Sequence, residues 1–397
     1  MKLIDSIVTQ AAGIATVRRE IHAHPELCFK EVRTADVVAS KLTQWGIPIH
    51  RGLGTTGVVG IVKNGTSSRA IGLRADMDAL PMQELNTFVH ASTQPGKMHA
   101  CGHDGHTAML LAAAQHLAKD RDFDGTVYLI FQPAEEGGGG AREMIKDGLF
   151  EQFPMDAVFG MHNWPGAGVG QFAVSPGAVM ASSNEFKITL RGKGGHGAMP
   201  HNAIDPVPVA CQLVHAFQTI ISRNIKPIDA GVISVTMIHA GEATNVIPNT
   251  CELQGTVRTF SLAVLDLIEQ RMKQITDHIC AAFAMTCDFE FERNYPPTIN
   301  SAFEAEFARR VMASIVGADK VTAQEPTMGA EDFSFMLQAK PGCYAFIANG
   351  DGTHRDMGHG GGPCMLHNAS YDFNDELIPL GATYWVRLVQ AWLKPGV

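Results

Sequence analysis

Two strand-like runs in this sequence end in residues that can bind a metal ion or carry a proton. The run 126–131 is followed by Glu135 and Glu136, and the run 157–161 is followed by His162. In an open α/β sheet, ligands bind at the carboxyl ends of the strands. The pattern therefore predicts an α/β fold whose site lies along one edge of the sheet.

A second group of candidate ligands lies in the stretch 98–106. Cys101 and His103 flank a glycine directly before an apolar helical pattern over 107–119. Thiolate sulfur and imidazole nitrogen bind zinc-like ions at ~2.3 and ~2.0 Å, so both side chains suit one ion. The run 70–74 brings Asp76 and Asp78 to the same edge of the sheet. We expect this stretch to form half of a metal site.

Composition limits the class of protein that could hold this site. The 397 residues are 45% hydrophobic and 18% charged, which is typical of a folded globular chain of two to three domains. The formal net charge of −9 argues against nucleic acid or an anionic membrane as a partner. A small-molecule or peptide substrate fits this charge better.

The cysteine pattern and the N-terminus predict a cytoplasmic protein. The eight cysteines show no paired spacing of the kind found in disulfide scaffolds. Asp5 interrupts the apolar residues at the N-terminus, so we expect no secretory signal. No apolar run reaches the ~18 residues of a transmembrane helix.

The pattern of expected strands and helices changes in the middle of the chain and predicts an inserted domain there. Its segments are expected in the order strand, helix, strand, strand, helix, strand, which is the ferredoxin-like unit. We assign residues 184–295 to this insertion and residues 1–183 and 296–397 to the catalytic, metal-binding domain. The expected strands are 185–191, 231–239, 250–260 and 287–293, and the expected helices are 205–223 and 263–283.

Each candidate ligand has an ordinary alternative when taken alone. A lone Cys-x-His pair often only packs, a Glu beside glycines can be a solvated loop residue, and a His after a strand can be a satisfied core group. Their joint placement, with His367 near the C-terminus, supplies enough ligands for two metals. The adjacent Glu135 and Glu136 suggest one metal ligand and one general base, although spacing does not say which is which.

The sequence resembles the M20 metallopeptidases, in particular their amidohydrolase branch of hippurate hydrolases, N-acyl-amino-acid deacylases and auxin-conjugate hydrolases. The resemblance covers nearly the whole chain, in order. It is carried by the segments 18–27, 73–81, 98–106, 131–138, 160–164, 192–197, 244–248, 329–333 and 366–367.

The resemblance implies a two-metal site with one general base. Glu135 would be the base, and Cys101 would take the bridging place that an Asp fills in most of the wider family. The chain has Asp76 and Asp78 where the wider family has His-x-Asp, so Asp78 is expected to support a ligand His. The implied ligands are Cys101, His103, Glu136, His162 and His367.

Further roles are expected in or near the insertion. The resemblance implies that His196 and Asn245 reach the active site of a partner subunit, where His196 stabilises the oxyanion; a loop residue is the alternative for His196. Arg258 is a candidate for gripping the substrate carboxylate, or else forms an ion pair. Glu331 or Asp332 is expected to contact substrate or groups around the metals. Four other histidines should orient loops, namely His22, His24, His99 and His106.

Together these features predict an α/β/α zinc-peptidase-like catalytic domain with an inserted lid or dimerisation domain. We expect a homodimer or dimer-based oligomer with two divalent ions per subunit, drawn from zinc, manganese, nickel and cobalt. The predicted reaction is hydrolysis of N-acyl amino acids of the hippurate or N-acetyl type. The alternatives are a dipeptidase or carboxypeptidase using the same site, and a non-catalytic binding protein, which would normally lack a ligand or the base.

Overall fold

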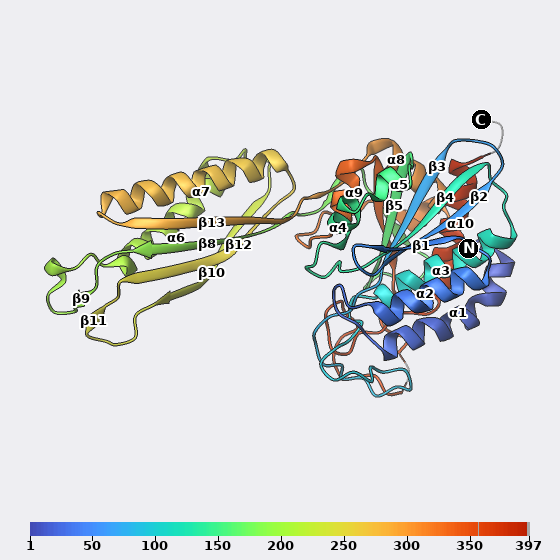
Figure 1. Cartoon of the computed structure of the whole chain (residues 1–397), viewed down its shortest axis with the longest axis horizontal. Helices are drawn as coiled ribbons and strands as arrows, with labels where there is room; N and C mark the ends of the chain where they lie inside the picture. Colours follow the sequence, from blue (N-terminus) through green and yellow to red (C-terminus); the bar gives the residue numbers. More distant parts are fainter. Residues whose placement is uncertain (356, 395–397) are drawn as a thin grey trace. The chain divides into compact units, whose positions relative to one another are not determined.

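The computed structural model describes residues 1–355 and 357–394. The chain folds into two compact units. The first unit comprises residues 1–177, 299–325 and 332–397, and the second comprises residues 178–298 together with 326–331. The segment 326–331 therefore groups with the middle of the chain. Figure 1 shows the elements of both units.

The first unit is built on an eight-stranded mixed sheet in the order β1-β2-β4-β3-β5-β16-β6-β15. Strand β3 runs parallel to β4 and β5, and β16 runs parallel to β5, so these strands share one carboxyl edge. Every residue of β3 and of β16 is buried, as expected for strands covered on both faces. The strands are β1 (Ile49–Leu53), β2 (Gly57–Asn64), β3 (Ala70–Asp76), β4 (Gly125–Gln132), β5 (Ala157–Trp164), β6 (Phe172–Ala173), β15 (Val321–Thr322) and β16 (Gly342–Ala348).

Helices cover this sheet and enclose its core. Helix α3 packs against α1, α10 and β3, and α2 packs against α3 and β2. Figure 1 shows α1, α2 and α3 side by side along the sheet. The helices are α1 (Asp5–Ala23), α2 (Val32–Gln44), α3 (His103–Lys119), α4 (Gly140–Lys146), α5 (Leu149–Gln152), α8 (Ala302–Val316), α9 (Phe333–Ala339) and α10 (Leu377–Trp392), with the 3-10 turn η2 (Ala318–Lys320).

Two expected boundaries near the site were wrong. Helix α3 begins at His103, not at Thr107, because Gly102 adopts a left-handed φ of +94° and lets the chain turn directly into the helix. Strand β5 continues to Trp164, so His162 lies within the strand. The neighbouring strand β16, which we did not predict from the sequence, pairs with β5 as far as Trp164. This pairing extends β5 past His162.

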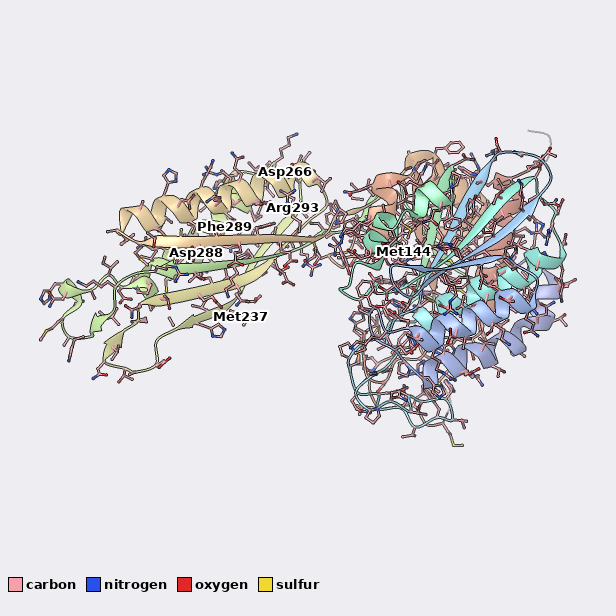
Figure 2. The ribbon with its side chains drawn as sticks, in the orientation of Figure 1. Met144, Met237, Asp266, Asp288, Phe289 and Arg293 are labelled. Carbon is pink, nitrogen blue, oxygen red and sulfur yellow. The ribbon has the colours of Figure 1, made fainter. Side chains whose placement is uncertain are left out.

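The second unit contains a four-stranded antiparallel sheet in the order β10-β12-β8-β13. Helices α6 and α7 pack on it, and the chain order strand, helix, strand, strand, helix, strand is the ferredoxin-like one. Arg293 of β13 pairs with Asp266 of α7, 2.7 Å from Nη1 to Oδ1 (Figure 2). These elements are β8 (Ser183–Arg191), α6 (Pro206–Arg223), β10 (Gly231–Ala240), β12 (Thr250–Thr259), α7 (Leu262–Ala282) and β13 (Thr286–Tyr295).

Short elements complete the chain, and the α/β fold class predicted from the sequence is confirmed. They are β7 (Gly177–Met180), β9 (Gly195–His196), η1 (Pro200–Asn202), β11 (Val246–Ile247) and β14 (Thr298–Asn300). Within the described residues, every helix is too short or too polar to cross a membrane.

Candidate metal centre

The five candidate ligands gather at the carboxyl edge of the first unit's sheet. Two triads each have ligand atoms within 4.8 Å of one another, and both include Cys101. The first triad adds His103 and His162, and the second adds Glu136 and His367. A thiolate common to two triads is the arrangement that a bridging ligand requires.

The separations between these side chains suit shared ions. Ligands on one tetrahedral ion, with bonds of ~2.1 Å, lie about 3.4 Å apart. Cys101 Sγ lies 3.2 Å from His162 Nε2, and His367 Nε2 lies 3.3 Å from Glu136 Oε1. His103 Nε2 and Glu136 Oε1, which also form a candidate group together with Glu135, lie 4.0 Å apart.

Local backbone geometry brings Cys101 and His103 together. The glycine between them has a positive φ, and a Cβ on Gly102 would lie 2.2 Å from Asn163 Nδ2, so only glycine fits. His367 is another left-handed residue, with φ +59°, and its N–H donates to the carbonyl of Ala100 at 2.8 Å. The backbone thus sets both segments before any ion binds.

One aspartate, Asp78, orients a histidine of the first triad. His103 Nδ1 lies 3.3 Å from Asp78 Oδ1, which leaves Nε2 directed at the centre. The Asp76 carboxylate is engaged elsewhere, at 2.6 Å from His106 Nδ1 and 2.7 Å from Arg74 Nη1. Asp78 therefore has the supporting position expected from the sequence.

Charge at the centre favours a cation. Burial alone would lower the pKa of His103, but the carboxylates of Asp76, Asp78 and Glu136 raise it to about 10. Burial raises the pKa of the Cys101 thiol well above its usual range, and nearby carboxylates raise it further. Since metal ligands must lose their protons, ion binding here competes with protonation.

Unsatisfied polar atoms also fit a metal. Among the described residues, His103 Nε2 and Glu136 Oε1 are buried and make no hydrogen bond, while the His367 ring lies 3.3 Å from Glu136 Oε1. Burial, together with the neighbouring His106, lowers the pKa of His162 well below its usual value, so its ring is neutral and able to bind a metal. Buried polar atoms without partners are costly unless a ligand satisfies them.

Glu135 lies beside the centre. One of its carboxylate oxygens is within 4.8 Å of ligand atoms of His103 and Glu136. The residue is 7% exposed, and its Oε1 accepts from the backbone N–H of Asp332 at 3.4 Å. The residue is therefore placed to exchange a proton with a molecule held at the triads.

Three of the four remaining histidines expected to orient loops have hydrogen bonds that fit such a role. His22 lies 2.9 Å from Asp104 Oδ2 through Nδ1 and 3.2 Å from Glu84 Oε1 through Nε2. His106 accepts from the Asn163 backbone N–H at 2.9 Å, and His24 contacts the Glu20 carbonyl at 2.9 Å.

His99 differs from these three. Among the described residues its two ring nitrogens have no hydrogen-bond partner, and burial lowers its pKa to about 4. Its role stays a prediction.

The residues expected to bind substrate lie in the second unit. His196 and Asn245 are neighbours there: His196 pairs with Val246 in the β9–β11 ladder, and the Gly197 N–H donates to the Asn245 carbonyl at 2.8 Å. Both side chains are exposed.

Arg258 and Glu331 belong to the same unit. Arg258 is on β12, where burial lowers the pKa of its guanidinium while Glu185 opposes that shift. Glu331 is buried, and its carbonyl accepts from Thr298 Oγ1 at 3.4 Å. Their roles stay predictions.

Asp332 belongs to a buried network that sequence reasoning missed. Its carboxylate accepts from Arg74 Nη2 at 3.1 Å, from Gln132 Nε2 at 2.8 Å and from the Ala141 N–H at 2.9 Å. The network fixes the end of β4 against the start of α4. The signal available in the sequence was a polar Arg in the otherwise apolar run 70–75.

A second missed network surrounds Arg18. Its guanidinium contacts Asp104 at 3.3 Å, Asp372 at 3.2 Å and Asp375 at 2.8 Å, all measured from nitrogen to oxygen. Arg18 thereby joins α1 to the start of α3 and to the segment that follows His367. The segment 18–27 was singled out only as a motif.

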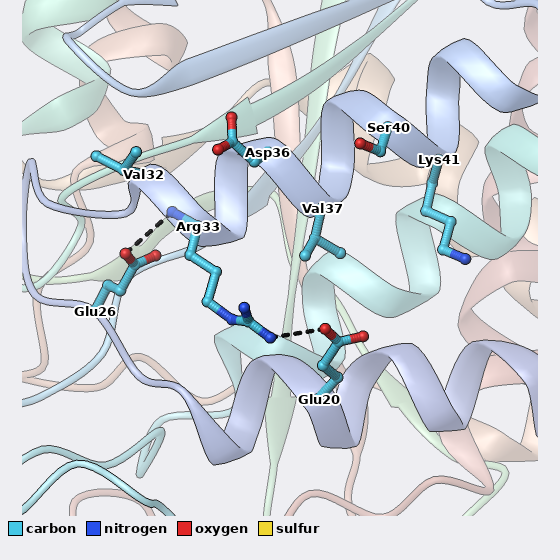
Figure 3. Close-up of a pocket in the computed structure, with 8 residues that line it drawn as sticks. All are labelled: Glu20, Glu26, Val32, Arg33, Asp36, Val37, Ser40 and Lys41. Carbon is cyan, nitrogen blue, oxygen red and sulfur yellow. Dashed lines mark hydrogen bonds and ion pairs between the residues drawn. The ribbon is translucent and has the colours of Figure 1, made fainter.

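A surface pocket between α1 and α2 contains none of the candidate ligands (Figure 3). Arg33 there pairs with Glu20 at 2.7 Å, and its N–H donates to Glu26 at 3.0 Å. The charges of Arg33, Glu20 and Glu26 therefore satisfy one another.

The chain is similar to known proteins over most of its length. The family model described as "Peptidase family M20/M25/M40" matches residues 72–391. The hippurate hydrolase of Campylobacter jejuni is 41% identical over 99% of this chain and 100% of its own length. Thermostable carboxypeptidase 2 of Saccharolobus solfataricus is 40% identical over 93% of this chain and 92% of its own length.

A solved structure is also similar. A Bacillus subtilis protein described as a dinuclear metal binding peptidase from the M20 family is 30% identical. It has a TM-score of 0.83 over 97% of this chain and 99% of the other.

Proposed function

The chain belongs to peptidase family M20/M25/M40, and on that premise we propose that it hydrolyses the amide bond of N-acyl amino acids. It is a hydrolase of amide bonds, and hippurate and N-acetyl-amino acids represent its substrate class. The products are a free amino acid and a carboxylate. The observation that carries this proposal is the pair of triads sharing Cys101, with Glu135 beside them.

Two divalent ions are proposed as the cofactor. Cys101, His103 and His162 would hold one ion, and Cys101, Glu136 and His367 the other. A thiolate ligand favours zinc, nickel or cobalt, and manganese is the remaining candidate because availability can override affinity. When bound, such ions lower the pKa of water and polarise a carbonyl.

Side chains of the protein would transfer the protons and bind the substrate. Glu135 accepts a proton from the attacking water and delivers it to the leaving nitrogen, and the second proton of the water follows by the same route, so that water and amide become a carboxylate and a protonated amine. Its Oε1 is fixed by the N–H of Asp332. We assign stabilisation of the oxyanion to His196 from a partner subunit and substrate contacts to Asn245, Arg258 and Glu331.

We propose a homodimer or dimer-based oligomer for this chain, located in the cytoplasm. Strand β10 is an edge of the second unit's sheet and exposes Val232, Met237 (labelled in Figure 2) and Ile238. Apolar side chains on an open edge favour pairing with another chain. Sedimentation of the purified protein tests the state: a monomer at micromolar concentration contradicts it.

The general base is tested by Glu135→Gln. We expect kcat on hippurate to fall 10²- to 10⁴-fold, with two ions per subunit retained by elemental analysis. Glu143→Gln, on the surface of α4, is the matched control and should leave kcat unchanged. Retained turnover in Glu135→Gln refutes the assignment.

A carboxypeptidase or dipeptidase is the second candidate, favoured by the similar carboxypeptidase. Rates on hippurate, N-acetyl-amino acids and dipeptides, each measured with zinc, manganese, nickel and cobalt, separate the two. Full hydrolysis by chelator-stripped protein would contradict any metal-dependent mechanism, and no hydrolysis of any substrate would favour a binding protein.

A further inference from the structure

The turn that carries Glu135 and Glu136 has an unfavourable backbone. Ala134, the residue before them, is held at φ +54°. Left-handed backbone at a residue with a Cβ is disfavoured by roughly 5- to 30-fold. Something outside the turn must therefore hold it, and the surroundings of this turn identify the groups that do.

Residues 28–31, which we call the clamp segment, lie against this turn. The Glu31 carboxylate is fully buried, and its Oε1 accepts from the Ala134 N–H at 2.9 Å. The same oxygen accepts from the Phe29 N–H at 3.0 Å, and Oε2 accepts from Thr56 Oγ1 at 2.6 Å. Both oxygens of Glu31 are thus engaged, one of them by the strained residue.

The next two amides of the turn are held by a second carboxylate. Asp78 accepts from the Glu135 N–H at 3.0 Å and from the Glu136 N–H at 2.9 Å. The Cys28 thiol, at the other end of the clamp segment, lies 3.3 Å from Asp78 Oδ2 and 3.0 Å from the Glu136 carbonyl. The N–H groups of the successive residues Ala134, Glu135 and Glu136 therefore all donate to two buried carboxylates, those of Glu31 and Asp78.

Glu31 is not needed as a cap for the helix that follows it. Although it precedes α2, its side chain makes no capping hydrogen bond. Glu26 caps α2 instead, because its carboxylate accepts from the Arg33 N–H at 3.0 Å and from the Thr34 N–H at 2.9 Å. The side chain of Glu31 is directed at the turn instead.

We propose that Glu31 is a positioning residue for hydrolysis: by binding the Ala134 N–H it holds the left-handed turn that directs Glu135 to the metal centre. This inference rests on the proposed role of Glu135 as general base. Glu31 is in none of the candidate ligand groups found among the described residues, and its oxygens accept from Phe29, Thr56 and Ala134 instead. Without it, the turn spends most of its time in conformations that misdirect the base, so kcat falls while substrate binding changes little.

The main test compares variants of the metal-loaded enzyme. Glu31→Leu keeps the volume but loses the acceptor, and we expect kcat about tenfold lower, KM within twofold and two ions retained. Glu31→Gln keeps an acceptor for Ala134 and should lose no more than threefold. Glu26→Gln, a carboxylate of the same region drawn in Figure 3, should leave kcat unchanged.

A double variant separates positioning from general stability. Glycine adopts left-handed backbone at little cost, so Ala134→Gly should restore most of the kcat lost in Glu31→Leu. Simple destabilisation by Glu31→Leu would not be relieved in this way. Wild-type kcat in Glu31→Leu, or a loss that Ala134→Gly does not relieve, overturns the proposal.

Hydrogen exchange of the wild-type protein provides a readout independent of activity and of variant folding. The Ala134 amide should exchange slowly, as a buried donor to Glu31. Rapid exchange there overturns the inference even if Glu31→Leu does not fold. Failure of the proposed function would look different, as absence of hydrolysis in the wild type or full turnover in Glu135→Gln.

Discussion

Asp78→Asn should weaken the metal centre without removing a ligand. Burial alone would raise the pKa of Asp78, but hydrogen bonds and charge from His103 and the N–H groups of Glu136 and Glu135 lower it, so the carboxylate is ionised. Asp78 Oδ1 pairs with His103 Nδ1 and accepts from the Glu135 N–H, and Oδ2 accepts from the Glu136 N–H. An asparagine has only one acceptor oxygen, so either orientation leaves at least one donor unpaired.

The expected magnitude follows from these contacts. A buried donor left unpaired costs about 1–3 kcal/mol, and loss of a carboxylate that orients a ligand histidine typically weakens metal binding about 10- to 100-fold. We therefore expect Asp78→Asn to lose about 2 kcal/mol in denaturant unfolding of the metal-free protein. Competition with a metal indicator should show the weakened ion site.

A matched control isolates the geometry of Asp78. Asp124 accepts the N–H groups of Thr66 and Ser67 through the same oxygen, Oδ1, at 2.8 Å each. Asparagine can keep both bonds there, so Asp124→Asn should cost less than about 1 kcal/mol. If Asp78→Asn binds both ions as tightly as wild type and unfolds at the same denaturant concentration, the two-oxygen argument is wrong.

Two other perturbations test buried charge. Burial raises the pKa of Glu31 from 4.5 to about 7, so the folded state holds an extra proton between these values and stability falls as pH rises through them. Glu31→Gln removes this dependence and should be more stable at pH 8 by up to about 3 kcal/mol in thermal or denaturant unfolding; an unchanged pH profile contradicts the shift. Arg18→Met leaves Asp104 and Asp372 buried without their guanidinium and should cost about 3–5 kcal/mol, again by denaturant unfolding, whereas a loss below 1 kcal/mol would show that the network is weak.

Periodicity and residue type were sufficient to predict most elements of the fold. The expected helix 205–223 and strand 231–239 differ by a residue or so from α6 and β10, because their apolar faces cover one core. The candidate ligands were chosen because Glu136 and His162 lie near the ends of expected strands and because Cys101 and His103 flank a glycine directly before an expected helix. Several short elements of the first unit were not predicted, namely β1, β6, β15, β16, α4, α5 and α9. Among them, β16 pairs with β5 and extends it past His162.

The residues that hold the site were harder to predict. Glu31 looks like an ordinary charged residue at the start of a helix, and its burial depends on Ala134, 103 residues further along the chain. Arg18 contacts carboxylates more than 350 residues away as well as Asp104. Local pattern carries no information on such pairs, since only the folded chain brings their charges together.

Two strained residues suggest how the first unit prepares its metal centre. Ala134 precedes the two glutamates and His367 is itself a candidate ligand, and both have left-handed φ values. Each donates its backbone N–H to a fixed acceptor, Glu31 Oε1 for Ala134 and the Ala100 carbonyl for His367. Strain of this kind persists only where neighbouring groups over-determine the conformation. The geometry around the ions therefore depends on these backbone anchors as well as on the ligands, so a ligand set transplanted without its anchors should bind metal more readily than it catalyses hydrolysis.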